Sequence, residues 1–132
     1  MTKTDHHGSY RIEQLDSYVR VSLAPEVQVT AELIFDVLDK EFRLPKSSAV
    51  NDLWDLRGSL PSDSLNYDAM VAIVDYIKER VRPDSPHRKT AIVADQSASY
   101  GMARMFENLA HKLPYDVRIF TSETEALEWI HA

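Results

Sequence analysis

The run TAIVAD, residues 90–95, limits the folds open to this chain more than any other segment. Its four consecutive apolar residues, Ala91 to Ala94, leave it no polar face. Strands of this kind lie inside parallel sheets that are covered on both faces. A helical pattern follows, in which Met102 and Phe106 lie four residues apart. Together the strand and the helix predict part of an α/β fold.

Changes in the apolar period predict the other elements. Alternating residues on either side of Asp16 and Ser17 predict a hairpin over residues 10–24. The remaining predicted elements are helix 30–44, strand 50–58, helix 66–81, strand 90–95, helix 97–113, strand 115–122 and helix 122–132. The apolar stripe of the second helix comprises Tyr67, Met70, Val71, Val74, Ile77 and Val81. Thr30 is a predicted N-cap, and Ser122 with Glu125 forms the pattern of a capping box.

This order, β-β-α-β-α-β-α-β-α, predicts an α/β domain with a mixed, mostly parallel sheet of about five strands and about four helices. The first strand of the hairpin is expected to add an antiparallel edge. We expect a single domain over residues 10–132. Residues 1–9 are polar and indicate a flexible N-terminal segment. Its adjacent His6 and His7 would need at least two more ligands to form a metal site, so no metal or cofactor is expected.

Charge and cysteine content argue against several classes of function. The 15 basic and 21 acidic residues give a formal charge of −6, which disfavours nucleic-acid binding and attachment to anionic lipid. No apolar run approaches the roughly 20 residues of a membrane span, and the first ten residues lack the apolar core of a signal peptide. The absence of cysteine removes thiolate chemistry and fits a reducing compartment. We therefore expect a cytoplasmic protein without stable membrane insertion.

Ligands of such sheets bind beyond the carboxyl ends of the parallel strands, which are expected near Asp55, Asp95 and Thr121. Asp55 could hold a ligand hydroxyl, although an Asp at the end of a strand also accepts hydrogen bonds from loop N–H groups. The Asp and Ser residues at the start of the third helix could attract an anion, but they are also ordinary capping residues. We expect Ser97 or Ser99 to cap this helix.

Tyr100 and Gly101 indicate a contact site, because Gly inside a helix suggests that a neighbouring helix or a ligand approaches the backbone closely. Tyr100 and Arg104 share one helical face, and both residue types are common in binding hot spots. We expect Met102 and Phe106 to be buried. The residues expected at a ligand or partner site are Asp55, Arg57, Ser59, Asp95, Ser97, Ser99, Tyr100 and Arg104.

Four segments, together with the order of the elements from Tyr10 to Ile130, carry a resemblance to a known family. LWDLRG, AIVAD, YGMARMFE and VRIFTSETEALEWI resemble the SpoIIAA-like group of bacterial proteins. This group belongs to the STAS superfamily (sulfate transporter and anti-sigma factor antagonist), which shares its fold type with Sec14-like lipid-binding domains. The resemblance implies a domain used for binding or signalling. In the anti-sigma antagonists a serine of an Asp-Ser-type motif is phosphorylated, but Ser59, Ser62 and Ser64 do not stand in that motif.

These observations predict a non-catalytic regulatory domain that binds a protein partner or a small ligand, with a homodimer as one form of association. A carrier for a small apolar or lipid ligand is an alternative, and it needs an enclosed cavity of about 300 Å³ or more. A hydrolase or transferase that uses Asp55 or Asp95 is a further alternative. The sequence reveals no nucleophile with an activating base, because His87, His111 and His131 form no recognisable Ser-His-Asp group.

Overall fold

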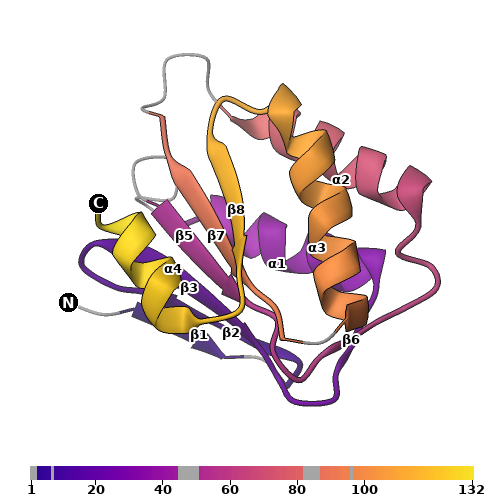
Figure 1. Cartoon of the computed structure of the whole chain (residues 1–132), viewed down its shortest axis with the longest axis horizontal. Helices are drawn as coiled ribbons and strands as arrows, with labels where there is room; N and C mark the ends of the chain where they lie inside the picture. Colours follow the sequence, from indigo (N-terminus) through magenta and orange to yellow (C-terminus); the bar gives the residue numbers. More distant parts are fainter. Residues whose placement is uncertain (1–2, 7, 45–50, 82–86, 96) are drawn as a thin grey trace.

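The computed structural model describes residues 3–6, 8–44, 51–81, 87–95 and 97–132 of the chain (Figure 1). The strands are β1 Lys3–His6, β2 Tyr10–Gln14, β3 Tyr18–Leu23, β4 Gln28–Val29, β5 Asn51–Asp55, β6 Leu60–Pro61, β7 Lys89–Val93 and β8 Asp116–Phe120. The helices are α1 Ala31–Phe42, α2 Tyr67–Arg80, α3 Ser97–Leu109 and α4 Glu123–Ile130, with a short 3₁₀ helix, η1, at Ala110–Lys112. Each helix and strand that the sequence predicts is present in the predicted order.

The main sheet has six strands in the order β1-β2-β3-β5-β7-β8. Strands β1, β2 and β3 pair antiparallel, whereas β3, β5, β7 and β8 pair parallel. The TAIVAD strand, β7, lies between β5 and β8, where its apolar residues are buried on both faces. The predicted mixed, mostly parallel sheet is confirmed.

Two features of the sheet differ from the prediction. Strand β1 occupies the segment for which the sequence indicated flexibility, and it pairs with β2 in the register Thr4↔Glu13 and Asp5↔Ile12. It makes the sheet six-stranded and takes the place of β2 as the antiparallel edge. Its polar residues carry no apolar alternation, so only backbone pairing defines it. The two-residue strands β4 and β6, which pair parallel, are likewise too short to show a period.

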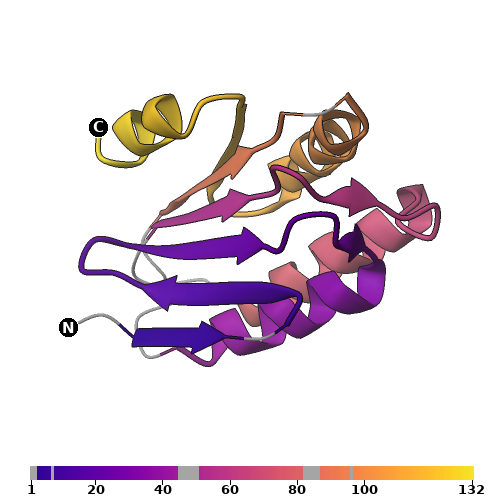
Figure 2. The ribbon, with the colours of Figure 1, turned by 90° about the horizontal axis from the view of Figure 1, so that it is seen from below.

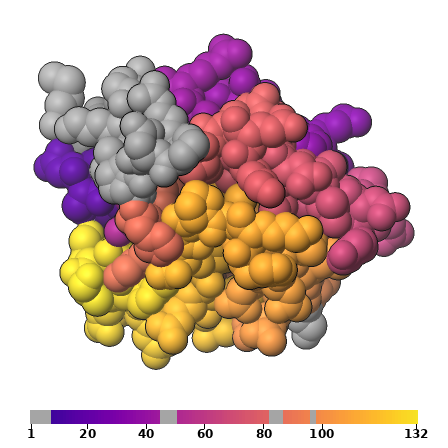
Figure 3. Space-filling model, turned by 90° about the horizontal axis from the view of Figure 1, so that it is seen from above, coloured from indigo at the N-terminus to yellow at the C-terminus, as the bar shows by residue number. Residues whose placement is uncertain are grey.

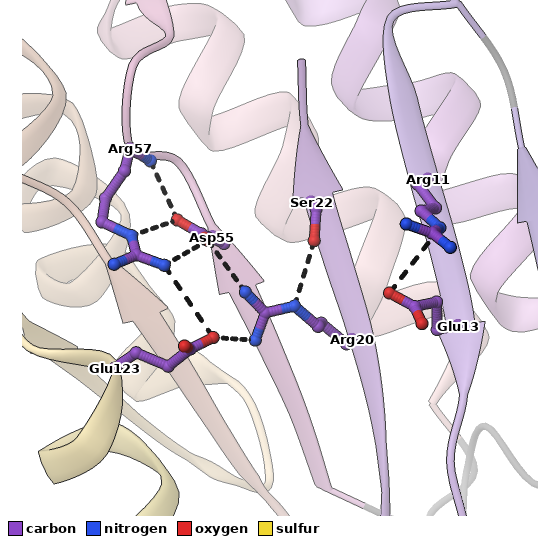
Figure 4. Close-up of polar contacts among 7 residues, drawn as sticks. All are labelled: Arg11, Glu13, Arg20, Ser22, Asp55, Arg57 and Glu123. Carbon is purple, nitrogen blue, oxygen red and sulfur yellow. Dashed lines mark hydrogen bonds and ion pairs between the residues drawn. The ribbon is translucent and has the colours of Figure 1, made fainter. Parts of the chain in front are cut away.

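Helices cover the two faces of the sheet unequally. Helices α1, α2 and α3 pack over the main core on one face, and Figure 3 shows them next to one another in purple, coral and orange. Helix α4 covers a smaller cluster on the other face, where Leu53, Ala91 and Val93 are buried with Ala126 and Ile130. In Figure 2, α4 lies toward the β8 end of the sheet, and no described helix is drawn in front of β1, β2 or β3. The polar side chains of Arg11 and Glu13 on β2 and of Arg20 and Ser22 on β3 lie on this open face, which no described helix covers (Figure 4).

Side-chain caps fix where the helices begin. The Thr30 Oγ1 atom accepts a hydrogen bond from the Leu33 N–H at 3.1 Å, and Ser122 Oγ accepts one from the Glu125 N–H at 3.3 Å, as predicted. The prediction for Tyr67 is wrong, because this first residue of α2 is 59% exposed whereas Met70 is buried. None of the described helices is long and apolar enough to cross a bilayer.

Candidate functional site

The three predicted strand–helix junctions converge at the carboxyl edge of the parallel strands. Asp55 ends β5, and Glu123 begins α4 shortly after β8. Two arginines connect these carboxylates, as Figure 4 shows. The junction after β7 joins the same edge, because the Ser99 hydroxyl in α3 donates to the Ser59 carbonyl oxygen at 3.1 Å. The topology therefore brings together residues that are far apart in the chain, such as Asp55 and Glu123.

Arg57 holds Asp55 with a two-pronged contact. The Arg57 Nε atom donates to Asp55 Oδ1 at 2.9 Å, and Nη2 donates to Oδ2 at 2.7 Å. The Arg57 backbone N–H also donates to Oδ1 at 3.1 Å. Parallel hydrogen bonds of this kind between charged groups are strong and geometrically specific. The sequence-based expectation that Asp55 receives loop N–H groups is confirmed, and the guanidinium contact adds to it.

Arg20 extends the contact into a four-residue ion-pair network of Arg20, Asp55, Arg57 and Glu123 (Figure 4). Its Nη2 atom lies 2.9 Å from Asp55 Oδ2, its Nη1 atom pairs with Glu123 Oε1, and its Nε atom donates to Ser22 Oγ at 3.1 Å. Two guanidinium groups thus balance two carboxylates. Arg20 is absent from the residues predicted from the sequence, because its place beside Asp55 follows from the β3–β5 register, in which Ser22 lies opposite Asp55.

This network sets the protonation state of Asp55. Burial tends to raise the pKa of its carboxyl group, but the hydrogen bonds from Arg57 and the charges of Arg57 and Arg20 outweigh burial and hold that pKa below its usual value. A carboxylate with a lowered pKa and two arginine partners is a weak proton acceptor, which disfavours Asp55 as a general base. Asp95, the other carboxylate of the enzymatic alternative, is exposed. No group of three or more potential metal ligands occurs among the described residues.

The predicted serines of this edge are structural where the structure describes them. Ser59 is fully buried, and its hydroxyl donates to the Leu56 carbonyl oxygen at 2.6 Å. Ser99 is also fully buried, and it lies inside α3, which already begins at Ser97. The prediction that Ser99 caps the helix is therefore wrong, since its hydroxyl is used to bind α3 to the segment before β6. The Ser97 side chain lies outside the described residues.

Tyr100 and Arg104 are both exposed on α3, as predicted. Tyr100 is 39% exposed, and the Arg104 guanidinium makes an ion pair of 3.0 Å with Glu107 on its own helix. Met102 is buried, as predicted, whereas Phe106 is only partly buried. This part of α3 presents an aromatic ring and a guanidinium to solvent while its opposite side packs into the core.

The interpretation that a neighbouring helix approaches Gly101 closely is wrong, whereas the alternative of an approaching ligand stays a prediction. A Cβ atom at this position would meet no atom of the described residues within 4 Å, and the residue is exposed. Gly101 therefore lowers the stability of α3 relative to Ala, and the described residues make no contact that compensates for this loss.

We expect Gly101→Ala to raise the free energy of unfolding by up to about 1 kcal/mol, because Ala has the higher helix propensity and restricts the unfolded chain. Urea denaturation followed by circular dichroism measures the change. A loss of stability would mean that Gly101 has a backbone conformation or a partner that Ala does not tolerate.

A second polar cluster lies under the sheet, on the face covered by α1, α2 and α3. Asp52 of β5 is its centre and accepts hydrogen bonds from Thr90 Oγ1 at 2.5 Å, Trp54 Nε1 at 3.0 Å and Arg88 Nη2 at 3.2 Å. Glu41, near the end of α1, is 2% exposed. Arg88 also lies over the ring of Tyr115, at 5.0 Å from its centroid. Charged groups are rarely buried to this degree unless they are paired.

Burial dominates the ionisation of this cluster. It raises the pKa of Glu41 well above the usual value, and the nearby Asp52 carboxylate raises it further, whereas Arg88 partly offsets both effects. Burial likewise raises the pKa of Tyr115. The cluster therefore favours a protonated Glu41 beside the Asp52–Arg88 ion pair. A signal for it is present in the sequence, because Asp52 interrupts an apolar strand and Glu41 lies at helical spacing from the apolar Val37 and Leu38.

The same cluster lines a cavity of about 70 Å³ between the sheet and the helices. Most of its other lining residues are apolar, among them Leu38, Met70, Ile73, Met102 and Phe106. Pockets for drug-sized ligands have volumes of about 300 Å³ or more. The cavity therefore falls short of the volume that the carrier alternative requires.

Comparison with known proteins identifies the fold. No family model and no curated protein matches the chain. Among solved structures, the chain is similar to an uncharacterized protein of the DUF3478 family from Shewanella loihica PV-4, which is described as having a SpoIIAA-like fold. The TM-score is 0.53 at 11% identity, over 98% of this chain and 92% of that one. The chain thus has an α/β fold of the SpoIIAA-like type, which confirms the fold that the resemblance implied.

Proposed function

We propose that this protein is a non-catalytic binding domain that regulates or recruits a protein partner through the start of α3 and the adjacent segments. The observation that carries the proposal is the distribution of exposed apolar side chains. Among the residues that the structure describes, the large apolar or aromatic side chains that are exposed are Leu60 at 47%, Tyr67 at 59% and Tyr100 at 39%. We call Leu60, Tyr67, Tyr100 and Arg104 the contact surface.

Two of these residues belong to segments that are neighbours in the fold. Leu60 and Tyr100 each follow a residue of the hydrogen-bonded pair Ser59 and Ser99, at the place where β6 packs against α3. Figures 1 and 2 place β6 and the first turns of α2 and α3 at the same end of the molecule. Tyrosine and arginine are over-represented in binding hot spots, where an apolar centre is surrounded by polar groups. The balanced ion-pair network of Arg20, Asp55, Arg57 and Glu123 lies at the carboxyl edge of the strands, close in sequence to Ser59 and Leu60.

The double variant Tyr100→Ala/Arg104→Ala is expected to weaken partner binding by about tenfold or more, because each residue contributes at the scale of a hot spot. We expect its melting temperature to change little, since both side chains are exposed and an ion pair such as Arg104–Glu107 adds little stability. Native mass spectrometry and sedimentation of the purified chain report a homodimer or a retained small molecule. Quantitative affinity capture with the full chain as bait reports another protein.

A matched control is available on α2. Tyr76 and Arg80 are also four residues apart, with the Arg80 guanidinium 3.4 Å from the centroid of the Tyr76 ring. The variant Tyr76→Phe/Arg80→Ala is expected to retain the association that the α3 variant loses. If the α3 variant and the control associate equally well, the contact surface is not the binding site. If the α3 variant melts at a much lower temperature, Tyr100 and Arg104 belong to the fold.

A further inference from the structure

The cavity under the sheet is independent of the contact surface and has its own chemistry. Its polar groups come from the residues near the amino ends of β5, β7 and β8, opposite the carboxyl edge, and include Asp52, Arg88 and Tyr115. Apolar side chains from α1, α2 and α3 form the remaining walls. A few polar groups that converge in an otherwise apolar cavity are the usual composition of a small-molecule site.

Glu41 indicates what such a ligand must supply. Its side chain is buried and lines the cavity, and its Oε2 atom has no hydrogen-bond partner within the described parts of the chain. The neighbouring Asp52 carboxylate, in contrast, accepts bonds from Thr90, Trp54 and Arg88. A buried acceptor without a donor is unfavourable and uncommon in folded proteins. The hydrogen bond between the side chains of Glu41 and Asp52 uses the proton of the Glu41 carboxyl group, so Oε2 is left as a carbonyl acceptor. The unfilled requirement of this cavity is therefore one O–H or N–H donor.

The volume of the cavity and the charges in its wall limit the class of ligand further. An engineered cavity of about 150 Å³ binds benzene, so about 70 Å³ has room for roughly three or four heavy atoms. The Arg88 charge in the wall is paired with Asp52, so a charged ligand would bring an unpaired charge into a mostly apolar cavity, which is unfavourable. A neutral hydroxyl group supplies the donor without adding charge. Met70 and Met102, whose side chains adapt readily, lie in the wall that the carbon atoms of a ligand would contact.

We propose that this cavity binds a short-chain alcohol, whose hydroxyl donates to Glu41 Oε2 and whose carbon atoms contact the apolar walls. The ligand would lie between the sheet and α1–α3, on the face of the sheet opposite α4. Binding there does not involve Tyr100 or Arg104. A negative result for this proposal therefore leaves the proposed function unaffected, and the reverse also holds.

The test compares 2-propanol with acetone, which has the same carbon skeleton but accepts hydrogen bonds only. Each is titrated into the ¹⁵N-labelled full chain, and the two indole N–H signals are followed. Trp54 lines the cavity and bonds to Asp52, whereas Trp129 packs against Phe120 of β8 on the α4 face. We expect the Trp54 signal to shift and saturate, with an affinity for 2-propanol about fivefold or more above that for acetone. The Trp129 signal is expected to stay unchanged.

Two substitutions assign the preference to Glu41. Glu41→Met removes the acceptor at similar size and is expected to abolish the preference for 2-propanol, whereas Glu41→Gln keeps a carbonyl oxygen and is expected to retain it. Equal affinities for the two probes in the wild-type chain would overturn the proposal, as would parallel, unsaturated shifts of both tryptophans. The wild-type comparison decides the matter even where a variant does not fold.

Discussion

Replacing Asp52 with alanine is expected to lower the free energy of unfolding by about 3–5 kcal/mol, the range found when one partner of a buried ion pair is removed. The Asp52 side chain is 3% exposed and that of Arg88 is 10% exposed. Truncation would leave the Arg88 charge buried with its Asp52 partner removed, and it would also take the acceptor from Thr90 Oγ1 and Trp54 Nε1. Urea denaturation followed by tryptophan fluorescence and circular dichroism measures the loss.

Two comparisons separate this effect from a general cost of removing an aspartate. Asp55→Ala also removes the carboxylate partner of arginines, but the Arg57 side chain is 38% exposed to water, and Arg20 keeps its contacts with Glu123 and Ser22, so the expected loss is only about 1 kcal/mol. The double variant Asp52→Ala/Arg88→Met removes the buried charge as well, and we expect it to recover a large part of the stability. A loss below about 1 kcal/mol for Asp52→Ala would show that the pair is not buried as the structure describes.

The sequence predicts the fold well because each long element has a clear apolar period. The four apolar residues of β7 place that strand in the sheet interior, and the strand–helix alternation then determines the parallel pairing. An apolar period cannot predict a strand that is held only by backbone pairing, and the sequence analysis misses β1 for that reason. Topology also predicts the edge at which Asp55 and the start of α4 meet, since carboxyl ends of parallel strands share one edge.

The partners of the predicted site residues depend on register and packing, which the sequence does not provide. Arg20 is one of several polar residues on the open face of β2 and β3, and only the alignment of β3 with β5 places it against Asp55. Glu41 and Asp52 each stand out as a charged residue in an apolar pattern. Their proximity follows from the packing of α1 under β5, so the sequence predicts two buried charges without predicting one cluster.

The variant Glu41→Gln is expected to be more stable than the wild-type chain at pH 8 by about 1–3 kcal/mol and equally stable near pH 4.5 and below. Burial and the charge of Asp52 raise the pKa of Glu41 in the folded state, whereas the unfolded chain has an ordinary carboxyl group. The folded protein therefore binds this proton more tightly than the unfolded chain does. The stability that proton binding contributes is fully present at pH values below the pKa of Glu41 in the unfolded chain, and it is lost as the pH rises through the pKa of Glu41 in the folded state. The uncharged Gln carries no such proton.

The measurement is urea denaturation of both proteins at intervals between pH 4 and pH 8, and the quantity of interest is the difference between them. Asp55 has a lowered folded pKa, so its contribution changes in the opposite sense, being lost as the pH falls, but it is common to both proteins and cancels in the difference. Asp52, Arg88 and Tyr115 face Glu41 in both proteins as well. A difference that stays constant across this pH range would mean that Glu41 titrates like an exposed carboxyl group and that Arg88, rather than burial, controls its charge.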